Sequence, residues 1–367
     1  MILWIIMIII GFALLIKGAD LLVDGASNIA KKFHIPEIII GLTVVSIGTS
    51  MPELFVSITS AIEGYPDMSI GNVIGSNIAN LLLVLGISAI LKPVKFKKET
   101  RLIEIPICVG VSLIFAFFTN LGRDITRLEA GVLLFLFVCF IIYTIIMAKK
   151  GEEFDEETDN NEIDEKKLNN NIKKIDEIKS KEKKKNKSEL KNSKIKNSKI
   201  KNSTLLDVIF VVLGAVMLKF GGDFAVNNSV KIANFLGLSE KLISVTILAL
   251  GTSLPELVTS ISAARKGNSD IAIGNILGSN VFNMLLIIGI SAMIKPITYN
   301  VEYNVDMIFM IAATVVLAMF PVIKPRNKMS RNNGIIYFLM YIAYMCVVFG
   351  RQIWWRFFWR WQITVNF

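Results

Sequence analysis

The chain contains repeated apolar runs of about 20 residues, the length that an α-helix needs to cross the hydrocarbon core of a bilayer. Hydrophobic residues make up 53% of the sequence, and the mean hydropathy is +0.57. Every backbone polar group in lipid must be satisfied within its own segment, so apolar runs of this kind form helices. The sequence therefore predicts an all-α polytopic membrane protein.

About ten transmembrane helices are expected. Their predicted ranges are 2–24, 37–62, 68–91, 102–119, 126–148, 205–228, 240–264, 270–294, 304–323 and 333–350. The first run lacks a basic leader and a small-residue cleavage site, so we expect it to stay as a spanning helix. Basic residues gather in alternate connections, which predicts a multi-pass protein of the cell membrane with the middle loop in the cytoplasm and both termini outside.

The two halves of the sequence repeat each other at a constant separation. Glu53 and Glu256 are 203 positions apart. The same separation relates Asp20 to Asp223, Asn72 to Asn275, Asn80 to Asn283, and Pro93 to Pro296. Each half holds about five helices, an odd number, so the second copy must enter the membrane in the opposite direction. We predict two inverted five-helix repeats, 1–149 and 204–350.

Each repeat contains one short motif, GTSMPE at 48–53 and GTSLPE at 251–256. Pro52 and Pro255 cannot donate the helical hydrogen bond, so we expect each helix to break at the membrane midplane. Glu53 and Glu256 place carboxylates where lipid cannot solvate them, which predicts that they face a protein interior or a water-filled cavity. The adjacent hydroxyls, of Thr49, Ser50, Thr252 and Ser253, add the hard oxygen ligands that Ca²⁺ and Na⁺ prefer.

Polar residues also recur every four positions on the third and eighth predicted helices, so each set lies along one helical face. We interpret four of them as lining the same site: Ser76, Asn80, Ser279 and Asn283. Asn72 and Asn275 have two open interpretations, as cation ligands or as hydrogen-bond links between helices. Asp20 and Asp223, near Lys17 and Lys219, are likewise expected either to form ion pairs or to line an ion path.

Two pairs of blocks resemble a known family. GTSMPELFVSITSA with GNVIGSNIANLLLVLG, and GTSLPELVTSISAA with GNILGSNVFNMLLIIG, are similar to the alpha-1 and alpha-2 repeats of the sodium/calcium exchanger family, prokaryotic type, within the cation/calcium antiporter superfamily. The resemblance implies a ten-helix antiporter that moves Ca²⁺ against Na⁺ by alternating access, with short first and sixth helices sliding across the core. The implied ligands are the Glu53 and Glu256 carboxylates, the hydroxyls of Thr49, Ser50, Thr252, Ser253, Ser76 and Ser279, and backbone carbonyls near Ser46, Ala249 and Thr252.

The motifs also bear on the coupling ion. Both copies read Thr-Ser-x-Pro-Glu, which is similar to the sodium-coupled branch, and Asn283 stands where potassium-dependent members have an aspartate. We therefore expect Na⁺ coupling, with Ca²⁺/H⁺ exchange, K⁺-dependent Na⁺/Ca²⁺ exchange and a passive cation channel as alternatives. Two glutamates balance one Ca²⁺ or two Na⁺, so the three-for-one stoichiometry that the resemblance implies predicts electrogenic exchange.

The remaining segments are less distinctive. We expect residues 150–203 to form a disordered cytoplasmic linker and 351–367 an interfacial aromatic and basic tail. The net charge of +10 comes largely from lysines in this linker and in short loops, so no nucleic-acid partner is expected. No nucleotide-binding motif is present, which favours a secondary transporter over an enzyme or a primary pump. We expect no cofactor, Ca²⁺ and Na⁺ as substrates, the lipid bilayer as surroundings, and a monomer.

Overall fold

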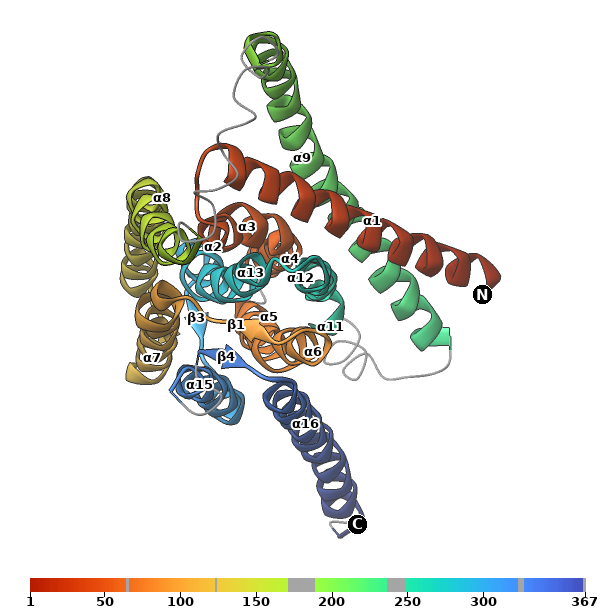
Figure 1. The fold of residues 1–367 in the computed structure, drawn as a ribbon. Coiled ribbons are helices and arrows are strands. Elements are labelled where there is room, and N and C mark those ends of the chain that lie inside the picture. Colours follow the sequence, from red (N-terminus) through yellow and green to blue (C-terminus); the bar gives the residue numbers. More distant parts are fainter. Residues whose placement is uncertain (64–65, 123, 171–188, 236–248, 323–326, 366–367) are drawn as a thin grey trace.

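The computed structural model describes residues 1–63, 66–122, 124–170, 189–235, 249–322 and 327–365 (Figure 1). The elements of the first half are α1 (Ile2–Lys32), α2 (Glu37–Ile40), the π-helical turn η1 (Gly41–Val45), α3 (Ser46–Thr49), α4 (Met51–Glu63), α5 (Pro66–Ile78), the π-helical turn η2 (Ala79–Val84), α6 (Leu85–Leu91), β1 (Val94–Lys95), the π-helical turn η3 (Thr100–Glu104), α7 (Ile105–Leu121), β2 (Asp124–Ile125) and α8 (Arg127–Asn170).

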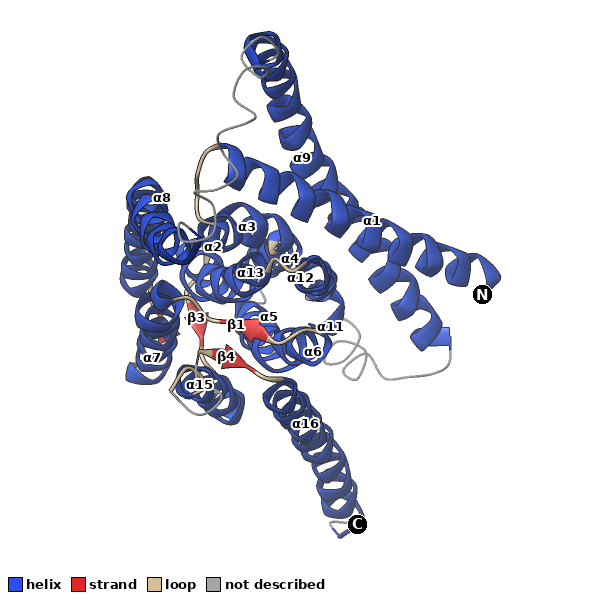
Figure 2. Ribbon diagram, viewed as in Figure 1, coloured by secondary structure: helices blue, strands red, loops and turns tan. Residues whose placement is uncertain are grey.

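The second half follows the same order. Its elements are α9 (Glu189–Phe235), α11 (Ala249–Thr252), α12 (Leu254–Lys266), α13 (Ser269–Phe282), the π-helical turn η6 (Asn283–Ile287), α14 (Ile288–Ile294), β3 (Ile297–Thr298), the 3₁₀ turn η7 (Val301–Tyr303), α15 (Asn304–Met319), β4 (Lys328–Met329) and α16 (Arg331–Val365). Apart from four two-residue strands and the short loops that connect the elements, the described chain is helical (Figure 2).

Within the described residues, eight helices are long and apolar enough to cross a membrane, or nine when the bent pair Glu37–Thr49 and Met51–Ile62 counts as one span. These spans coincide with nine of the ten predicted ranges. The other predicted range, 240–264, begins outside the described residues, which resume at α11. The prediction of an all-helical polytopic membrane protein is confirmed.

The first helix is longer than expected. α1 has 31 residues, continuing beyond the predicted 2–24 and beyond the short helix that the resemblance implies. It packs along α9 through glycines spaced seven apart: a Cβ added at Gly11, Gly18 or Gly25 would lie 2.8, 2.9 or 2.6 Å from a backbone oxygen of α9 (Figure 1). This row of glycines, the glycine seam, lets the backbones of α1 and α9 approach closely along their length. α1 ends at Lys32, two residues before His34, whose φ of 51° lies in the left-handed region.

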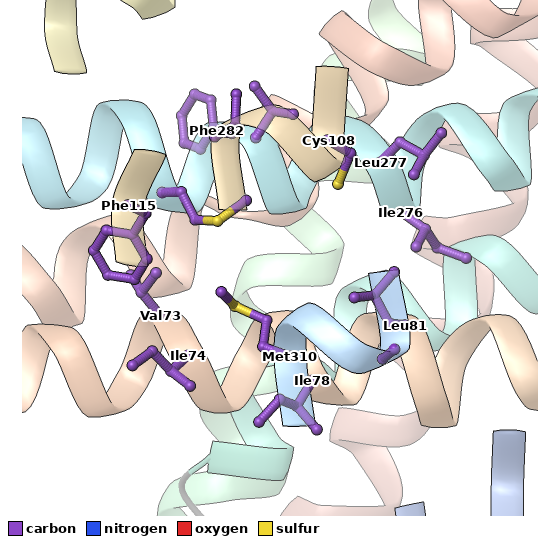
Figure 3. Packing of buried hydrophobic residues seen from close by; sticks show 14 of the residues in the cluster. Val73, Ile74, Ile78, Leu81, Cys108, Phe115, Ile276, Leu277, Phe282 and Met310 are labelled. Carbon is purple, nitrogen blue, oxygen red and sulfur yellow. The ribbon is translucent and has the colours of Figure 1, made fainter. Parts of the chain in front are cut away.

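Two spans occupy the centre of the molecule. The most apolar windows of α5–η2–α6 and α13–η6–α14 are 78% and 83% buried, against 22% for α1. Their apolar side chains pack against each other and against α7 and α15, as Ile78, Leu81, Ile276, Phe282 and Met310 do in Figure 3. The central pair therefore forms a protein-lined interior, while the surrounding helices expose apolar faces.

The contacts between the halves follow the inverted repeat. β1 of the first half pairs antiparallel with β4 of the second, and β2 pairs with β3 in the same way. Gly86 of α6 packs on the backbone of α16, and its repeat equivalent Gly289 of α14 packs on Leu134 of α8. Each half thus completes the other, as expected for two repeats related by an axis in the membrane plane.

The two aspartates with open interpretations both form ion pairs. Asp20 accepts a hydrogen bond from Ser262 at 2.6 Å and lies 3.3 Å from Lys266 Nζ. Lys266 also pairs with Asp24 at 2.7 Å, so it fastens α1 to the end of α12. Asp223 pairs with Lys219 within α9 at 3.3 Å.

The predicted linker and tail lie largely outside the described side chains. α8 enters the segment 150–203 from one end as far as Asn170, and α9 enters it from the other end at Glu189. Residues 171–188 and the side chains of 351–367 are not described. The domain boundaries therefore stay a prediction.

Candidate cation site

Both proline motifs adopt the same local geometry. α3 ends at Thr49 and α4 begins at Met51, with a bend of 49° between the two parts. The intervening Ser50 has φ −86° and ψ 9°, and its repeat equivalent Ser253, between α11 and α12, has φ −86° and ψ 4°. This conformation lies in the sparsely populated bridge region. The expected helix breaks are therefore present in both repeats.

The two glutamates that follow these breaks are completely buried. The Ser50 hydroxyl, from the first repeat, donates to Glu256 Oε1 of the second repeat at 2.8 Å. Ser279 lies 2.8 Å from the Ser50 hydroxyl and 3.4 Å from the same carboxylate oxygen. Ser76 donates to Glu53 Oε1 at 3.5 Å, and the Glu53 and Glu256 carboxylates interact electrostatically. The two half-motifs therefore meet in one place.

Several buried oxygens on α4, on α12 with its preceding residue, and on the turns η2 and η6 that pack against these helices have no hydrogen-bond partner in the described structure. They are one carboxylate oxygen of each glutamate (Glu53 Oε2 and Glu256 Oε2), the side-chain oxygens of Asn80 and Asn283, and the hydroxyl oxygens of Ser253 and Thr259. Buried polar atoms are normally paired, because an unsatisfied group costs about 1–3 kcal/mol. The glutamate and asparagine oxygens come in pairs related by the repeat, which makes them candidates for a shared ligand.

Hydrogen bonds between asparagine side chains of the two repeats, which we call the crossed amides, orient the side-chain oxygens of Asn80 and Asn283. Asn80 donates through Nδ2 to Asn280 Oδ1 at 3.2 Å, and Asn283 donates to Asn77 Oδ1 at 3.0 Å. Asn77 and Asn280 in turn donate to each other's backbone carbonyl at 3.4 Å. Asn80 and Asn283 therefore each donate from their N–H₂ group to the opposite repeat, and their side-chain oxygens have no hydrogen-bond partner in the described structure.

Sequence reasoning missed Asn77 and Asn280, although they follow the same separation of 203 positions as the other repeat pairs. It also missed the π-helical turns η2 and η6, which begin at Ala79 and Asn283. π-Helical turns of this kind frequently occur at functional sites. A systematic comparison of all polar pairs at this separation could have found the two asparagines.

Asn72 and Asn275 link helices to each other. Their Nδ2 groups donate to Ser57 and Ser260, each at 3.0 Å. Their Oδ1 atoms accept from the threonines of the opposite motif, at 3.5 Å from Thr252 and 2.9 Å from Thr49. Of the two open interpretations, the geometry therefore favours the structural one.

The predicted backbone ligands are carbonyls near Ser46, Ala249 and Thr252. The Ser46 carbonyl accepts from the backbone N–H of Ser50 at 2.9 Å and from the Thr49 hydroxyl at 3.3 Å. Ala249 begins α11, and its side chain is not among those described. In the described part of the chain, no group of three or more His, Cys, Asp or Glu residues could hold a metal ion. The site is therefore built from two acids and neutral oxygens.

The crossed amides give a testable expectation. Asn280→Ala removes the acceptor that orients Asn80, so we expect the affinity for Ca²⁺ to fall about tenfold, a loss of about 1.4 kcal/mol. Isothermal titration calorimetry of the purified protein measures this change. Asn120→Ala is the matched control, because Asn120 is exposed and its amide bonds only within α7. Equal affinities for the two variants would contradict the orienting role of Asn280.

Comparisons with known proteins fit this arrangement. The sequence profile of the sodium/calcium exchanger protein family matches residues 3–146 and 206–350, which are the two halves. The chain belongs to the sodium/calcium exchanger family. It is a secondary transporter of the cation antiporter type and not an enzyme, and its resemblance to the prokaryotic members is confirmed.

Individual members resemble the whole chain. The putative antiporter CaxA of Alkalimonas amylolytica is 33% identical over 94% of this chain and 98% of its own length. The sodium/calcium exchanger MaX1 of Methanosarcina acetivorans is 32% identical over the same shares. The inner membrane protein YrbG of Escherichia coli is 32% identical over 85% of this chain and 87% of its own length. These full-length matches cover both repeats of this exchanger-family chain.

The fold also matches solved structures. The sodium-calcium exchanger NCX_Mj soaked with Na⁺ superposes with a TM-score of 0.74 at 28% identity, covering 94% of this chain and 98% of that one. The same protein soaked with Na⁺ and Ca²⁺ gives the same score at 26% identity. The exchanger-family fold therefore extends over nearly the whole of both chains.

Proposed function

We propose that this exchanger-family chain carries out secondary active exchange of Ca²⁺ for Na⁺ by alternating access. The observation that carries the proposal is the pair of buried glutamates together with the two asparagine oxygens on η2 and η6, the turns that pack against α12 and α4. One carboxylate oxygen of each glutamate and the side-chain oxygens of Asn80 and Asn283 lie unpaired in the protein interior. A cation would satisfy these oxygens and balance the two negative charges.

The oxygens suit hard cations. Ca²⁺ takes six to eight oxygen ligands at about 2.3–2.6 Å, and Na⁺ also binds oxygen. We assign the Glu53 and Glu256 carboxylates as the main ligands, assisted by Asn80, Asn283 and the hydroxyl of Ser253. The hydroxyls of Ser50, Ser76 and Ser279 complete the proposed set, while Thr49 and Thr252 contribute through their contacts with Asn275 and Asn72. Backbone carbonyls near Ser46, Ala249 and Thr252 would supply further ligands.

Exchange would follow from competition for one ligand set. Ca²⁺ and Na⁺ would use the same carboxylate oxygens, so neither set of ions could bind fully with the other in place. In the empty site the two glutamates would repel each other and oppose closure, which suppresses uncoupled leak. α1 and α9, joined by their glycine seam, form the unit that we expect to slide across the central helices.

Two relatives bear on the choice of coupling ion. MaX1 is described as a sodium/calcium exchanger and matches nearly the whole chain. The sodium/potassium/calcium exchanger 2 of Rattus norvegicus matches only 32% of this chain and 18% of its own length. The neutral Asn283, in place of an aspartate, supports exchange without K⁺, because a third acid would favour an additional monovalent cation.

The direct test is uptake of radioactive Ca²⁺ into sealed vesicles that contain the purified chain. An outward Na⁺ gradient is expected to drive uptake, whereas matched H⁺ or K⁺ gradients are not. Uptake driven by an H⁺ gradient alone would replace the proposal with Ca²⁺/H⁺ exchange. Uptake that needs both Na⁺ and K⁺ would indicate K⁺-dependent exchange, and flux indifferent to every gradient would indicate a passive channel.

Electrogenic exchange is part of the proposal. Two Na⁺ neutralise the two glutamates, so a third Na⁺ leaves one net positive charge on the Na⁺-loaded site and none on the Ca²⁺-loaded site. One charge moving through 100 mV changes the free energy by about 2.3 kcal/mol. We therefore expect an inside-positive voltage to increase Na⁺-driven Ca²⁺ uptake into vesicles. A rate unchanged by voltages clamped with a K⁺ ionophore would contradict the three-for-one ratio.

The orientation in the membrane is also proposed. The basic connections place the middle segment in the cytoplasm and both termini outside. YrbG, an inner membrane protein, supports a location in the cell membrane. Labelling of single cysteines placed in the middle segment and at the N-terminus, from each side of intact cells, measures this arrangement.

A further inference from the structure

A second buried acid lies away from the candidate cation site. Glu104 ends the π-helical turn η3, at the start of the span Thr100–Leu121, and only 2% of its side chain is exposed. Both of its carboxylate oxygens have no hydrogen-bond partner in the described structure. A bare carboxylate in an apolar interior costs several kcal/mol, so this group needs a neutralising ligand.

Two hydroxyls stand near this carboxyl. Thr100 lies four residues earlier in η3, so it shares a face with Glu104, and its buried hydroxyl is also unpaired in the described structure. Tyr143 of α8 is near enough to interact electrostatically with Glu104, and its hydroxyl is likewise buried and unpaired. The cluster of Glu104, Thr100 and Tyr143 therefore combines an acid with two hydroxyls.

The cluster has no counterpart in the second repeat. The positions equivalent to Glu104, Thr100 and Tyr143 are Met307, Tyr303 and Cys346. The inverted-repeat fold is therefore built in the second half without a buried acid at this place. The fold therefore does not require the buried acid that the first half carries.

The charged side chains around the cluster indicate which kind of ligand could neutralise Glu104. Glu99, just before η3, and Asp270, at the start of α13, add negative charge around Glu104. Lys97 pairs with Asp270 at 2.9 Å, and Arg101 bonds to Asn327 at 2.6 Å. Glu104 itself accepts no hydrogen bond from a side chain of the described residues.

A divalent ion fits this cluster poorly. The cluster carries a single buried negative charge with hydroxyls around it, which one proton neutralises without further ligands.

We propose that Glu104 is a proton-binding site, in which one proton neutralises the buried carboxyl near Thr100 and Tyr143. The proton sits on a carboxylate oxygen, and no other bond changes. Release of the proton places a further negative charge near Asp270, at the start of the helix that carries Asn275 and Ser279 and continues into η6 at Asn283. Proton occupancy is thereby linked to α13, one of the two central helices.

Infrared difference spectroscopy of the purified full chain tests this site without any transport measurement. A protonated carboxyl has a C=O stretching band that a carboxylate lacks and that shifts in D₂O. We expect Glu104→Gln to remove part of the band area seen for the wild type at neutral pH. Glu104→Met, which introduces the residue of the second repeat, is expected to remove the same area. Glu302→Gln, at an exposed acid, is the control and leaves the area unchanged.

Each other outcome overturns the proposal. Equal band areas in the wild type and Glu104→Gln mean that Glu104 is ionised. A Glu104 band that appears only when Na⁺ and K⁺ are removed means that a metal cation occupies the site. Should both Glu104 variants fail to fold, Tyr143→Phe keeps the carboxyl and removes a nearby polar hydroxyl. The less polar surroundings are expected to shift the Glu104 band to higher frequency, and an unshifted band then contradicts the cluster. These infrared results do not depend on whether the chain exchanges Na⁺ for Ca²⁺ in vesicles.

Discussion

Glu256→Gln is expected to lower Na⁺-driven Ca²⁺ uptake at least about 100-fold, and Glu53→Gln is expected to do the same. Each substitution keeps the size of the side chain but removes one of the two negative charges that balance Ca²⁺. A 100-fold loss corresponds to about 3 kcal/mol, which is modest for removal of one partner of a buried charge pair. Vesicle uptake of radioactive Ca²⁺ under an outward Na⁺ gradient measures the effect.

The controls separate loss of the site from loss of the fold. Asp124→Asn neutralises an exposed acid in β2 and is expected to leave uptake within about twofold of the wild type, as is usual for surface changes. The glutamate variants are expected to elute as the wild type does in size-exclusion chromatography, because glutamine fits the same space. Near-normal uptake by either glutamate variant would refute the assignment of the site.

Gly278→Ala is expected to have the second-largest effect. A Cβ at Gly278 would lie 2.6 Å from the Leu42 carbonyl oxygen and 2.7 Å from Ser46 Oγ, in the broken helix that carries the first motif. Backbone cannot move aside as a flexible side chain can, so the two helices must separate. Overpacking of this kind costs about 1–3 kcal/mol and here also displaces the Ser50–Glu256 contact.

A matched glycine provides the comparison. Gly110 of α7 has nothing within 4 Å of an added Cβ, and its repeat equivalent is already an alanine, Ala313. We expect Gly110→Ala to keep both the melting temperature and the Ca²⁺ uptake, while Gly278→Ala lowers both. The explanation by close helix contact fails if the two variants behave alike in thermal unfolding followed by tryptophan fluorescence.

The general architecture could be predicted because each step depends on local chemistry. Long apolar runs determine the spans, and the separation of Glu53 from Glu256 reveals the duplication. Pro52 and Pro255 determine where helices break, since a missing N–H acts on its own turn. An odd number of helices in each repeat then determines the inverted arrangement, and the family match to both halves agrees with it.

The details of the site depend on contacts between the halves, which no local pattern encodes. The pairing of Asn80 with Asn280 is such a contact, and so is that of Ser50 with Glu256. The full length of α1 depends on its glycine seam with α9. The π-helical turns were missed for another reason, because their five-residue hydrogen bonds leave almost no trace in hydrophobic periodicity. The sequence thus predicts which oxygens are available, and packing between repeats decides which of them stay unpaired.

The central claim is that oxygens from both repeats enclose one cation. A structure determined with Sr²⁺ or Ca²⁺ bound tests it most directly. The account predicts one ion in contact with the carboxylates of Glu53 and Glu256, at about 2.3–2.6 Å for Ca²⁺. An ion that contacts only one of these carboxylates, or that binds elsewhere while both stay buried and unoccupied, would contradict it.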